Sequence, residues 1–559
     1  MAWLRTAFMG LIGLWLLQVL ADDAYAQDNS LQRFVPGELI IGYNSSQERD
    51  DAIRNINEKK DTFRVRGANP VNTQVKKVGE NGLVLRLDFP EAVKRGTRSN
   101  PVSEYSLLEE AAKQLKESDP RVKYAHPNWI MRIEPPMPPT SNDKQFKLQN
   151  FEEGAKILPQ SAKNEPNDPL FGLQWHYQPT PVGMNAIGAW ELTKGSKDIV
   201  VAVLDTGIAE NNDIKNSGNV LPGYDFVSRD MCGTTIVPIK RGPGATDKGG
   251  CTDAEVSEWH GTHVAGTIGA VGSNNGIGVA GVAWNVTVLP VRVLGPHGGS
   301  LEDIIDAMSW AAGLDVPGIP KNERNEHPAN IINMSLGITL RIGEHTFACT
   351  HESAGASIDG INAYIDAIES VRKQGVVVVA SAGNGEWLDA AYQSCSPTRQ
   401  NVSEHKCNFI RDDVEIGAPG GCPGVISVAA SDHIGHLTGY SGFGNVTIMA
   451  PGGDPEQTMN AVVNGKEIKL PYGVVSSIKN TYDILAGTSM AAPHVSGALA
   501  LALAYHPEWR GNPDLIERML RASAVAPVSG ACPKNRPCGP GQLDARKLLE
   551  AQTPPAANK

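Results

Sequence analysis

Short, wholly apolar runs separated by helical stretches dominate the chain from residue 167 onward. Five of these runs are candidate strands: Ile199–Leu204, Val286–Val293, Ile331–Met334, Val376–Ala380 and Val425–Ala429. Strands that are apolar on both faces are typical of a parallel sheet covered by helices on each side. The pattern therefore predicts an α/β fold with a doubly wound, mostly parallel sheet. In such a sheet the working residues lie at the carboxyl ends of the strands.

The region before residue 134 has a different pattern. Phe34–Tyr43 has strand character, and Gly82–Phe89 alternates apolar and polar residues as a half-buried strand does. Leu107–Leu115 has helical spacing, and Val122–His126 leads into a final strand. We therefore expect a small α+β domain within residues 27–133, before a larger domain at 167–559.

Two further segments frame these domains. Glu134–Thr140 contains four prolines in seven residues, and the polar stretch continues, which predicts an exposed, protease-accessible linker at 134–166. The first 26 residues combine Arg5, an apolar run from Ala7 to Leu20 and a small-x-small end at Ala24–Ala26. They are interpreted as a signal peptide; the alternative is a membrane anchor, for which the run is short.

Composition narrows the possible partners. The net charge of −11 argues against a general nucleic-acid binder.

The eight cysteines form an even set and, in an exported chain, indicate disulfides. Cys532 and Cys538 can close a small loop, whereas Cys232 with Cys251 and Cys395 with Cys407 bracket loops that need fastening. The spacing does not decide the connectivity.

Four segments carry residues of chemical interest. Asp205 ends an apolar run in Val-Leu-Asp-Thr-Gly, His260 opens a helix in His-Gly-Thr-His-Val-Ala-Gly, and Asn384 lies in Ser-Ala-Gly-Asn-Gly. Ser489 lies in Gly-Thr-Ser-Met-Ala-Ala-Pro-His at the start of an alanine-rich helix. Taken singly, each has a plainer interpretation as a turn residue or helix cap. His260 with His263 could also bind zinc, although His263 fits a packing role.

Together, these residue types are the set that nucleophilic catalysis by a serine requires. A serine hydroxyl becomes a good nucleophile when a neighbouring imidazole takes its proton. The imidazole needs a carboxylate that fixes its tautomer and stabilises the imidazolium. The tetrahedral intermediate carries an oxyanion, which the Asn384 side chain and the backbone N–H of Ser489 can stabilise.

The segments around Asp205, His260 and Ser489, in that order, resemble the signatures of the subtilisin-like serine proteases, or subtilases, from about Asn167 to Ala551. The resemblance implies that Asp205 is the orienting acid, His260 the general base, Ser489 the nucleophile and Asn384 the oxyanion donor. It also implies a pairing of Cys349 with Cys422. Substrate would lie as an extended strand between two edges, with a specificity pocket behind them; the residues implied are Gly298, Gly299, Ser300, Ser335, Leu336, Gly337 and Gly417.

The same resemblance implies a structural calcium ion. The loop Ser273–Val279 is similar to the family's calcium loop, and Asp168 and Asp213 match its carboxylates. The implied ligands are Asp168, Asp213, Ser273, Asn275, Ile277 and Val279. Oxygen ligands on a loop suit Ca²⁺; the alternative is a plain Asn/Gly turn.

The domain before the linker resembles the family's inhibitory propeptide. The segments Val35–Ile40 and Val122–Asn128 look like the first and last strands of that propeptide. We therefore expect a secreted, monomeric serine endopeptidase of broad specificity, which acts on proteins or peptides through an acyl-enzyme. It would be made as a self-processing zymogen with its own propeptide as inhibitor. One alternative is a selective processing protease, whose access is restricted by insertions at Arg229–Glu258 and Glu386–Cys422. Another is a surface adhesion or binding protein whose protease fold is incidental.

Overall fold

The computed structural model divides the chain into two compact units. The first comprises residues 1–77, 81–130 and 341–345, and the second comprises 78–80, 131–340 and 346–559. The structure describes residues 34–58, 65, 72–89, 104–133, 165–232, 236–251, 259–337, 341–342, 345–346, 362–384, 417–463 and 466–552. The predicted signal peptide and nearly all of the predicted linker lie outside these residues.

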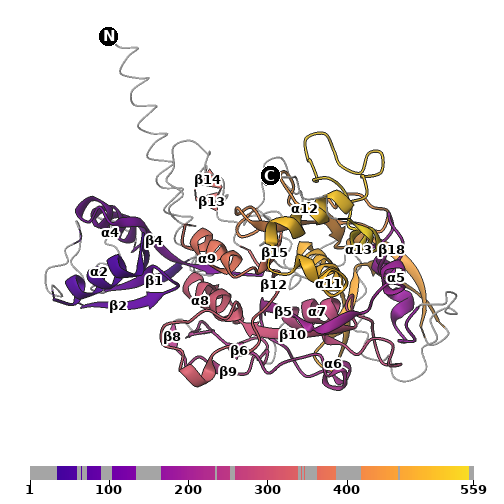
Figure 1. The fold of residues 1–559 in the computed structure, drawn as a ribbon, viewed down its shortest axis with the longest axis horizontal. Helices are drawn as coiled ribbons and strands as arrows, with labels where there is room; N and C mark the ends of the chain where they lie inside the picture. The colour runs from indigo at the N-terminus through magenta and orange to yellow at the C-terminus, as the bar shows by residue number, and fades with distance from the viewer. Residues whose placement is uncertain are drawn as a thin grey trace, which may run out of the picture. The chain divides into compact units, whose positions relative to one another are not determined.

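Among its described residues, the first unit contains an antiparallel sheet and the two helices α2 and α4 (Figure 1). Its strands follow the order β4-β1-β3-β2. Leu39 and Ile41 of β1 lie opposite Leu85 and Leu83 of β3, and all four are fully buried. Helix α4 adds Leu107, Leu108 and Ala111 to this core. The bounds are β1 Phe34–Tyr43, α2 Ser46–Glu58, β2 Asn72–Val78, β3 Gly82–Asp88, α4 Glu104–Ser118 and β4 Val122–Met131.

The second unit is built on an eight-stranded sheet with the order β17-β16-β15-β12-β5-β10-β6-β9. The pairs among the first seven of these strands are parallel where their register is described, and β6–β9 is antiparallel. The strands are β5 Gly195–Asp205, β6 Tyr224–Asp225, β9 Gly242–Pro243, β10 Asn285–Arg292, β12 Ile331–Met334, β15 Val377–Ser381, β16 Val425–Ser431 and β17 Ile448–Pro451. All five predicted apolar runs are strands of this sheet.

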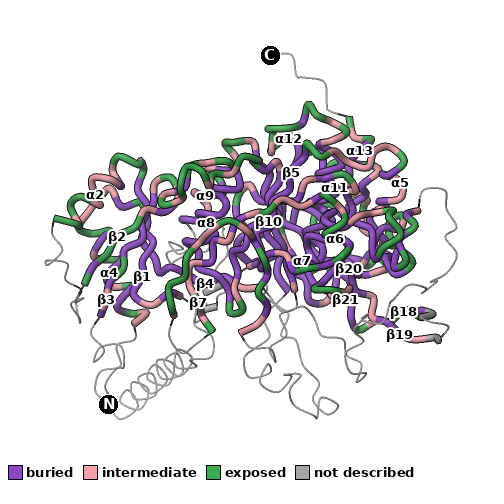
Figure 2. The backbone as a smooth tube through the Cα atoms, turned by 90° about the horizontal axis from the view of Figure 1, so that it is seen from below, coloured by how far each residue is buried: buried purple, intermediate pink, exposed green. Residues whose placement is uncertain are grey.

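Helices cover both faces of this sheet. In Figure 1, α8 and α9 lie on one side of β5 and β12, and α7 and α11 lie on the other. The strands β12, β15, β16 and β17 are buried throughout, and the carboxyl half of β5 is buried as well (Figure 2), as expected for strands with a helix layer on each face. The helices are α5 Ala186–Trp190, α6 Asn212–Ser217, α7 His260–Ala265, α8 Leu301–Ala311, α9 Asn362–Lys373, α11 Thr488–Tyr505, α12 Pro513–Ser523 and α13 Ala545–Glu550, with a π-helical turn at Gly266–Ala270.

Two hairpins were not predicted from the apolar runs. They are β18 Asp454–Val463 with β19 Lys466–Tyr472, and β20 Val474–Ile478 with β21 Thr481–Leu485. Their strands form separate two-stranded sheets, and Val474 and Val475 of β20 with Leu470 of β19 pack into the main hydrophobic core. Polar residues interrupt the apolar residues of these strands, so no continuous apolar run marks them. The remaining short elements are β7 Arg229–Asp230, β8 Val237–Pro238, β11 Gly299–Ser300, β13 Arg341–Ile342, β14 His345–Thr346 and the 3₁₀ turns Phe171–Leu173, Trp175–Tyr177, Lys321–Glu323 and Pro507–Trp509.

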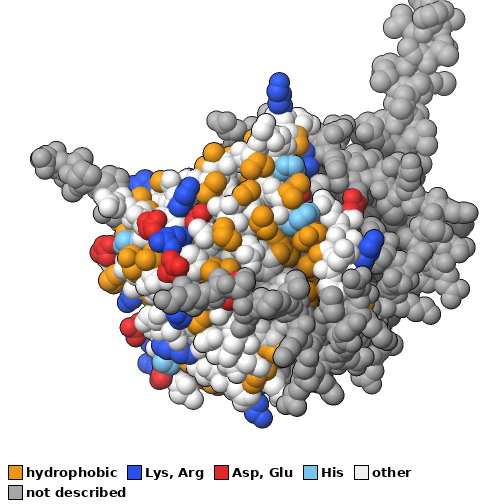
Figure 3. Space-filling view, turned by 90° about the vertical axis from the view of Figure 1, so that its right-hand side faces the viewer, with side chains coloured by type: hydrophobic (Ala, Val, Ile, Leu, Met, Phe, Trp, Pro, Cys, Tyr) orange, Lys and Arg blue, Asp and Glu red, His pale blue; other side chains and the backbone are white. Residues whose placement is uncertain are grey.

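The surface of the second unit mixes charge signs. On the face shown in Figure 3, basic and acidic side chains lie among one another, with hydrophobic side chains between them. This pattern agrees with the modest net negative charge. Within the described part of the chain, no helix is long and apolar enough to span a membrane.

Candidate active site

A buried carboxylate–imidazole pair lies at the carboxyl end of β5. His260 Nδ1 lies 2.9 Å from Oδ1 and 3.0 Å from Oδ2 of Asp205. Both side chains are at most 1% exposed. Asp205 Oδ1 also accepts a hydrogen bond from the Thr206 amide at 2.7 Å. An acceptor on this side of the ring places a proton on Nδ1, which leaves Nε2 as the basic nitrogen of the neutral imidazole.

Glycine brings the two residues together. A Cβ on Gly261 would lie 2.4 Å from the Gly207 carbonyl oxygen and 3.1 Å from Asp205 Cβ. Only glycine therefore allows α7 to begin this close to the end of β5. The residue before His260, Trp259, caps α7 in the left-handed conformation (φ 49°), and the Lys479 ammonium lies over its ring at 4.6 Å.

Ser489 is the second residue of α11, whose N-cap is Gly487. Helix α11 packs against β5 and α7, the two elements that carry Asp205 and His260. The Ser489 hydroxyl donates to the Ser335 carbonyl at 3.3 Å, and the Ser335 hydroxyl donates to the Ser489 carbonyl at 2.8 Å. This exchange ties the start of α11 to the residue that follows β12.

Asn384 lies three residues beyond the end of β15. Its Oδ1 accepts hydrogen bonds from both the backbone N and Oγ1 of Thr488, each at 2.8 Å. A Cβ on Gly487 would lie 3.2 Å from Asn384 Nδ2. Because Thr488 holds the amide oxygen, the amide nitrogen lies near Gly487, the N-cap of α11. Sequence reasoning missed Thr488, although it adjoins Ser489 in the same motif.

Sequence reasoning also missed a second carboxylate near the Asp205–His260 pair. Thr206 Oγ1 donates to Asp247 Oδ2 at 2.6 Å and accepts from the Gly261 amide at 3.0 Å. Asp247 is buried, and burial raises the pKa of its carboxyl. No motif surrounds Asp247 in the sequence, since it lies in the insertion after β5. The residue supports the turn that presents Asp205 and the helix start that presents His260.

The predicted substrate edges differ in how closely they join the site. Ser335 contacts Ser489 directly, and Leu336 is buried beside it. Gly337 exchanges backbone hydrogen bonds with Arg132 at 3.1 and 3.2 Å. Gly298 closes a tight turn with Gly295, after which Gly299 and Ser300 form β11 and lead into α8.

Gly417 begins a turn before β16, closed by a hydrogen bond from the Gly421 amide at 2.9 Å. Its place in a specificity pocket stays a prediction from resemblance.

The predicted calcium residues converge on one loop. Asp168 accepts from the amides of Asn274 at 2.7 Å and Asn275 at 3.0 Å. Asp213 Oδ1 accepts from the Gly272 amide at 3.0 Å and from Asn275 Nδ2 at 3.1 Å. Asn275 thus bridges two carboxylates that are far apart in sequence. Ser273 Oγ accepts from the Gly281 amide, Asn275 Oδ1 from the Ile277 amide, and Asp213 Oδ2 from the Val279 amide.

The electrostatics of this loop fit a cation. Burial, with a smaller contribution from the Asp168 charge, raises the pKa of Asp213 to about 7, and burial raises that of Asp168 to about 6. Ionising both carboxylates is costly unless a positive charge lies between them. Among the described residues, no cluster of three or more His, Cys, Asp or Glu side chains could hold a metal. Two carboxylates with amide and carbonyl oxygens are, however, a donor set that suits Ca²⁺.

Three further histidines are buried in the second unit: His494 on α11, His263 on α7 and His176 in the 3₁₀ turn Trp175–Tyr177. His494 of α11 contacts His176 through Nε2 and Nδ1 at 2.8 Å, and its Nδ1 lies 2.7 Å from the Met490 carbonyl oxygen. His263 Nε2 lies 3.0 Å from the Val474 carbonyl oxygen. Burial lowers the pKa of His494 to about 4 and that of His263 to about 3, and it lowers the pKa of His176 as well. These histidines are neutral packing residues in neutral solution.

Two predicted disulfides lie among the described residues. Cys232 pairs with Cys251 at a Cα–Cα distance of 5.3 Å, and Cys532 pairs with Cys538 at 5.9 Å. Cys422 is disulfide-bonded, but Cys349, Cys395 and Cys407 lie outside the described residues. The Cys349–Cys422 and Cys395–Cys407 pairings stay predictions.

The chain belongs to the subtilase family: the family model for Peptidase S8 matches residues 196–546. An extracellular protease of Xanthomonas campestris pv. campestris is 37% identical over 394 residues, which cover 69% of this chain and 57% of that relative. The chain thus spans little more than half of that relative's length.

Two solved structures are also similar. A protease from Pseudoalteromonas arctica is 35% identical with a TM-score of 0.52, covering 69% of this chain and 98% of the other. Fervidolysin from Fervidobacterium pennivorans, described as a keratinolytic enzyme related to subtilisin, is 23% identical with a TM-score of 0.55. That match covers 94% of this chain and 62% of fervidolysin, and it bears on the fold alone.

Proposed function

We propose that the protein is an exported serine endopeptidase that hydrolyses peptide bonds through an acyl-enzyme on Ser489. The observation that carries the proposal is the buried Asp205–His260 pair at the end of β5, beside the helix that begins at Thr488. The names of relatives described as extracellular proteases support export.

Each residue has a role in the reaction. His260 Nε2 takes the Ser489 proton as the hydroxyl attacks the scissile carbonyl, and Asp205 stabilises the imidazolium. The same imidazolium then gives its proton to the leaving amine. Water, activated by His260, hydrolyses the ester bond to Ser489 and restores the enzyme.

The oxyanion of each tetrahedral intermediate needs donors that are already in place. The Asn384 amide, held by Thr488, supplies one N–H. The backbone N–H of Ser489 supplies a second, since the first amides of a helix lack partners within the helix. Both donors come from the rigid ends of β15 and α11, so little reorganisation accompanies the reaction.

A serine-directed covalent inhibitor tests the activity. We expect it to abolish hydrolysis of a peptide substrate and to label Ser489 stoichiometrically, as mass spectrometry of the labelled peptide would show. Ser489→Ala should be inactive and unlabelled. Ser196→Ala, at the opposite end of β5, should keep full activity. Peptide hydrolysis that survives in Ser489→Ala would refute the assignment and would leave the adhesion protein as the better interpretation.

We further propose that the N-terminal unit is an inhibitory propeptide that the enzyme removes itself. A peptide-like contact supports this: Arg132 pairs with Gly337 as an antiparallel strand would, and its side chain donates to the His297 carbonyl at 3.1 Å. Arg132, which follows the N-terminal unit in the chain and belongs to the second unit, thus pairs like a peptide residue at a predicted substrate edge. Ser489→Ala expressed in a protease-deficient host should accumulate uncleaved precursor; normal processing of this variant would refute self-removal.

Broad specificity is the first expectation, because backbone hydrogen bonds to Gly337 depend little on the side chains of the substrate. The selective alternative has its own support, since Arg229, the first residue of the insertion, donates to Ser300 Oγ at 3.1 Å and to Glu302 at 2.9 Å. Digestion of a denatured protein mixture separates the two. Many unrelated cleavage sites favour the broad protease, and a few defined sites favour the selective one.

For the metal, we propose that Ca²⁺ is held by Asp168, Asp213 and Asn275 with backbone oxygens of Ser273, Ile277 and Val279. The raised pKa values of the two aspartates support this assignment. The ion would stabilise the loop between α7 and β10 and would take no part in bond cleavage.

A further inference from the structure

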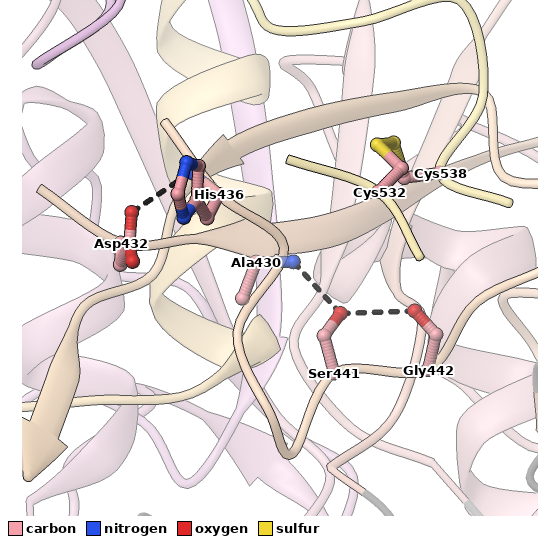
Figure 4. The surroundings of a disulfide bond; sticks show 7 residues. All are labelled: Ala430, Asp432, His436, Ser441, Gly442, Cys532 and Cys538. Atoms are coloured by element: carbon pink, nitrogen blue, oxygen red, sulfur yellow. Dashed lines mark hydrogen bonds between the residues drawn. A yellow bond between two sulfur atoms is a disulfide. The ribbon is translucent and has the colours of Figure 1, made fainter. Parts of the chain in front are cut away.

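A disulfide-closed loop near the C-terminus contacts the segment that follows β16. The loop runs from Cys532 to Cys538, and it meets residues 437–444 at both of its ends. The Leu437 amide donates to the Ala531 carbonyl at 3.0 Å, and the Gly444 amide donates to the Pro537 carbonyl at 2.8 Å. Figure 4 shows the disulfide together with Ala430, Ser441 and Gly442 of the neighbouring segments.

Arg536 makes the central contact of this loop. Its Nη2 donates to the Ser441 carbonyl at 2.7 Å and to the Thr438 carbonyl at 3.4 Å. Its guanidinium lies over the Phe443 ring at 4.8 Å. Hydrogen bonds from a charged donor are stronger than neutral ones, so Arg536 holds the course of residues 438–443.

Residues 438–443 contact the residues that follow β15. The Gly442 amide donates to the Gly383 carbonyl at 2.7 Å, and a Cβ on Gly442 would lie only 2.2 Å from the Ala382 carbonyl oxygen. The Ser441 hydroxyl accepts from the Ala430 amide at 2.9 Å, as Figure 4 shows. A shift of this segment therefore displaces Gly383, the residue before Asn384.

Gly383 is held from two sides. Its carbonyl accepts from Gly442, and its amide donates to Thr488 Oγ1 at 3.2 Å. Thr488 in turn holds the Asn384 amide oxygen. The apolar cluster beneath includes Ala382, Phe443 and Cys538, so the disulfide is packed into the same support.

We propose that Arg536 is a positioning residue for the oxyanion donor Asn384, and that the Cys532–Cys538 disulfide serves to hold Arg536 in place. The proposal rests on the role of Asn384 proposed above. Arg536 touches neither substrate nor reacting atoms; it acts through Ser441, Gly442 and Gly383. Its loss should therefore weaken stabilisation of the transition state and leave substrate binding intact.

The test compares Arg536→Ala and Arg536→Lys with Arg510→Ala, a matched control. Arg510 also donates to a backbone carbonyl, that of Leu503 at 3.0 Å, but at the far end of α11. Rates are measured on a peptide p-nitroanilide and normalised to the active fraction found by titration with a serine-directed inhibitor. A peptide aldehyde and the corresponding peptide alcohol are then compared as inhibitors, because only the aldehyde forms an oxyanion-like adduct.

For Arg536→Ala we expect kcat to fall about 10-fold with KM nearly unchanged, a smaller loss than removal of the donor itself. Binding of the aldehyde should weaken by a similar factor, whereas binding of the alcohol should not change. Arg536→Lys should recover part of the loss, since an ammonium can still reach one carbonyl. If Arg536→Ala does not fold, the Lys variant carries the test by the same aldehyde-to-alcohol ratio. An unchanged ratio in the folded variants overturns the proposal.

The Asn384→Ala variant distinguishes the positioning role of Arg536 from the oxyanion role of Asn384 on which it rests. If Asn384→Ala keeps normal kcat, the oxyanion role of Asn384 fails, and the positioning role fails with it. If kcat falls in Asn384→Ala, adding Arg536→Ala should cause no further fall, because the two residues act on the same step. A further fall of the same size would overturn the role of Arg536 and leave that of Asn384 standing.

Discussion

Gly261→Ala is the sharpest test of how the fold builds the site. The new Cβ would lie 2.4 Å from the Gly207 carbonyl oxygen, where ordinary contacts begin at 3.4 Å. The start of α7 would have to move by the difference, 3.4 − 2.4 = 1.0 Å. The obstructing atom belongs to the backbone, so no flexible side chain can relieve the overlap. His260, the neighbouring residue, would move away from Asp205.

The size of the effect follows from this displacement. A misplacement of about 1 Å in an active site costs about 10²-fold in rate. Full loss of the orienting acid costs about 10⁴-fold, which sets the upper bound. Overpacking of this kind lowers the free energy of unfolding by about 1–3 kcal/mol, so the variant should still fold. We therefore expect kcat to fall about 100-fold.

The assay measures kcat on a peptide p-nitroanilide after active-site titration, together with the thermal midpoint. Gly242→Ala is the matched control, since a Cβ there meets no atom within 4 Å. It should keep wild-type kcat and stability. A folded Gly261→Ala variant with kcat within about threefold of wild type would refute the reasoning, because it would mean that the Asp205–His260 contact survives the shift.

Three further predictions follow from the site. Asn384→Ala should lower kcat by about 10²–10³-fold, the magnitude known for oxyanion donors in members of this family, measured with the p-nitroanilide; a loss below tenfold would contradict the assignment. Acid should destabilise the fold, because the pKa of His494 is about 4 in the folded protein against an ordinary 6.5. The contribution of neutral His494 to the free energy of unfolding is complete above pH 6.5 and is lost as the pH falls towards 4. The loss is on the order of 3 kcal/mol. Urea unfolding of Ser489→Ala from pH 8 to 4 measures this loss, and His494→Gln should flatten the curve. Chelation by EDTA should lower the thermal midpoint more at pH 8 than at pH 5. The raised pKa values of Asp213 and Asp168 mean that, without metal, their contribution to stability is present below pH 4 and is lost as the pH rises through 6–7. Asp213→Asn should remove most of the EDTA effect; equal EDTA effects at both pH values would contradict the calcium assignment.

Much of the fold was predictable because local patterns reflect burial. The apolar runs became β5, β10, β12, β15 and β16, since a strand covered on both faces must be apolar throughout. The motifs also pointed to Asp205 and His260, which the structure places in direct contact. The hairpins β18–β19 and β20–β21 were not predicted, because strands in separate two-stranded sheets need no continuous apolar run.

The sequence by itself determined the apolar strands of the fold, and it predicted which residues carry the chemistry, since the motifs place each residue type at the end of a strand or the start of a helix. Only the tertiary structure decided what holds those residues in position. Thr488 contacts Asn384 across 104 positions, and Ser335 contacts Ser489 across 154. Arg536 contacts Ser441 across 95 positions. Such hydrogen bonds form only after the parallel strands bring distant segments to one edge of the sheet, so no local pattern can reveal them.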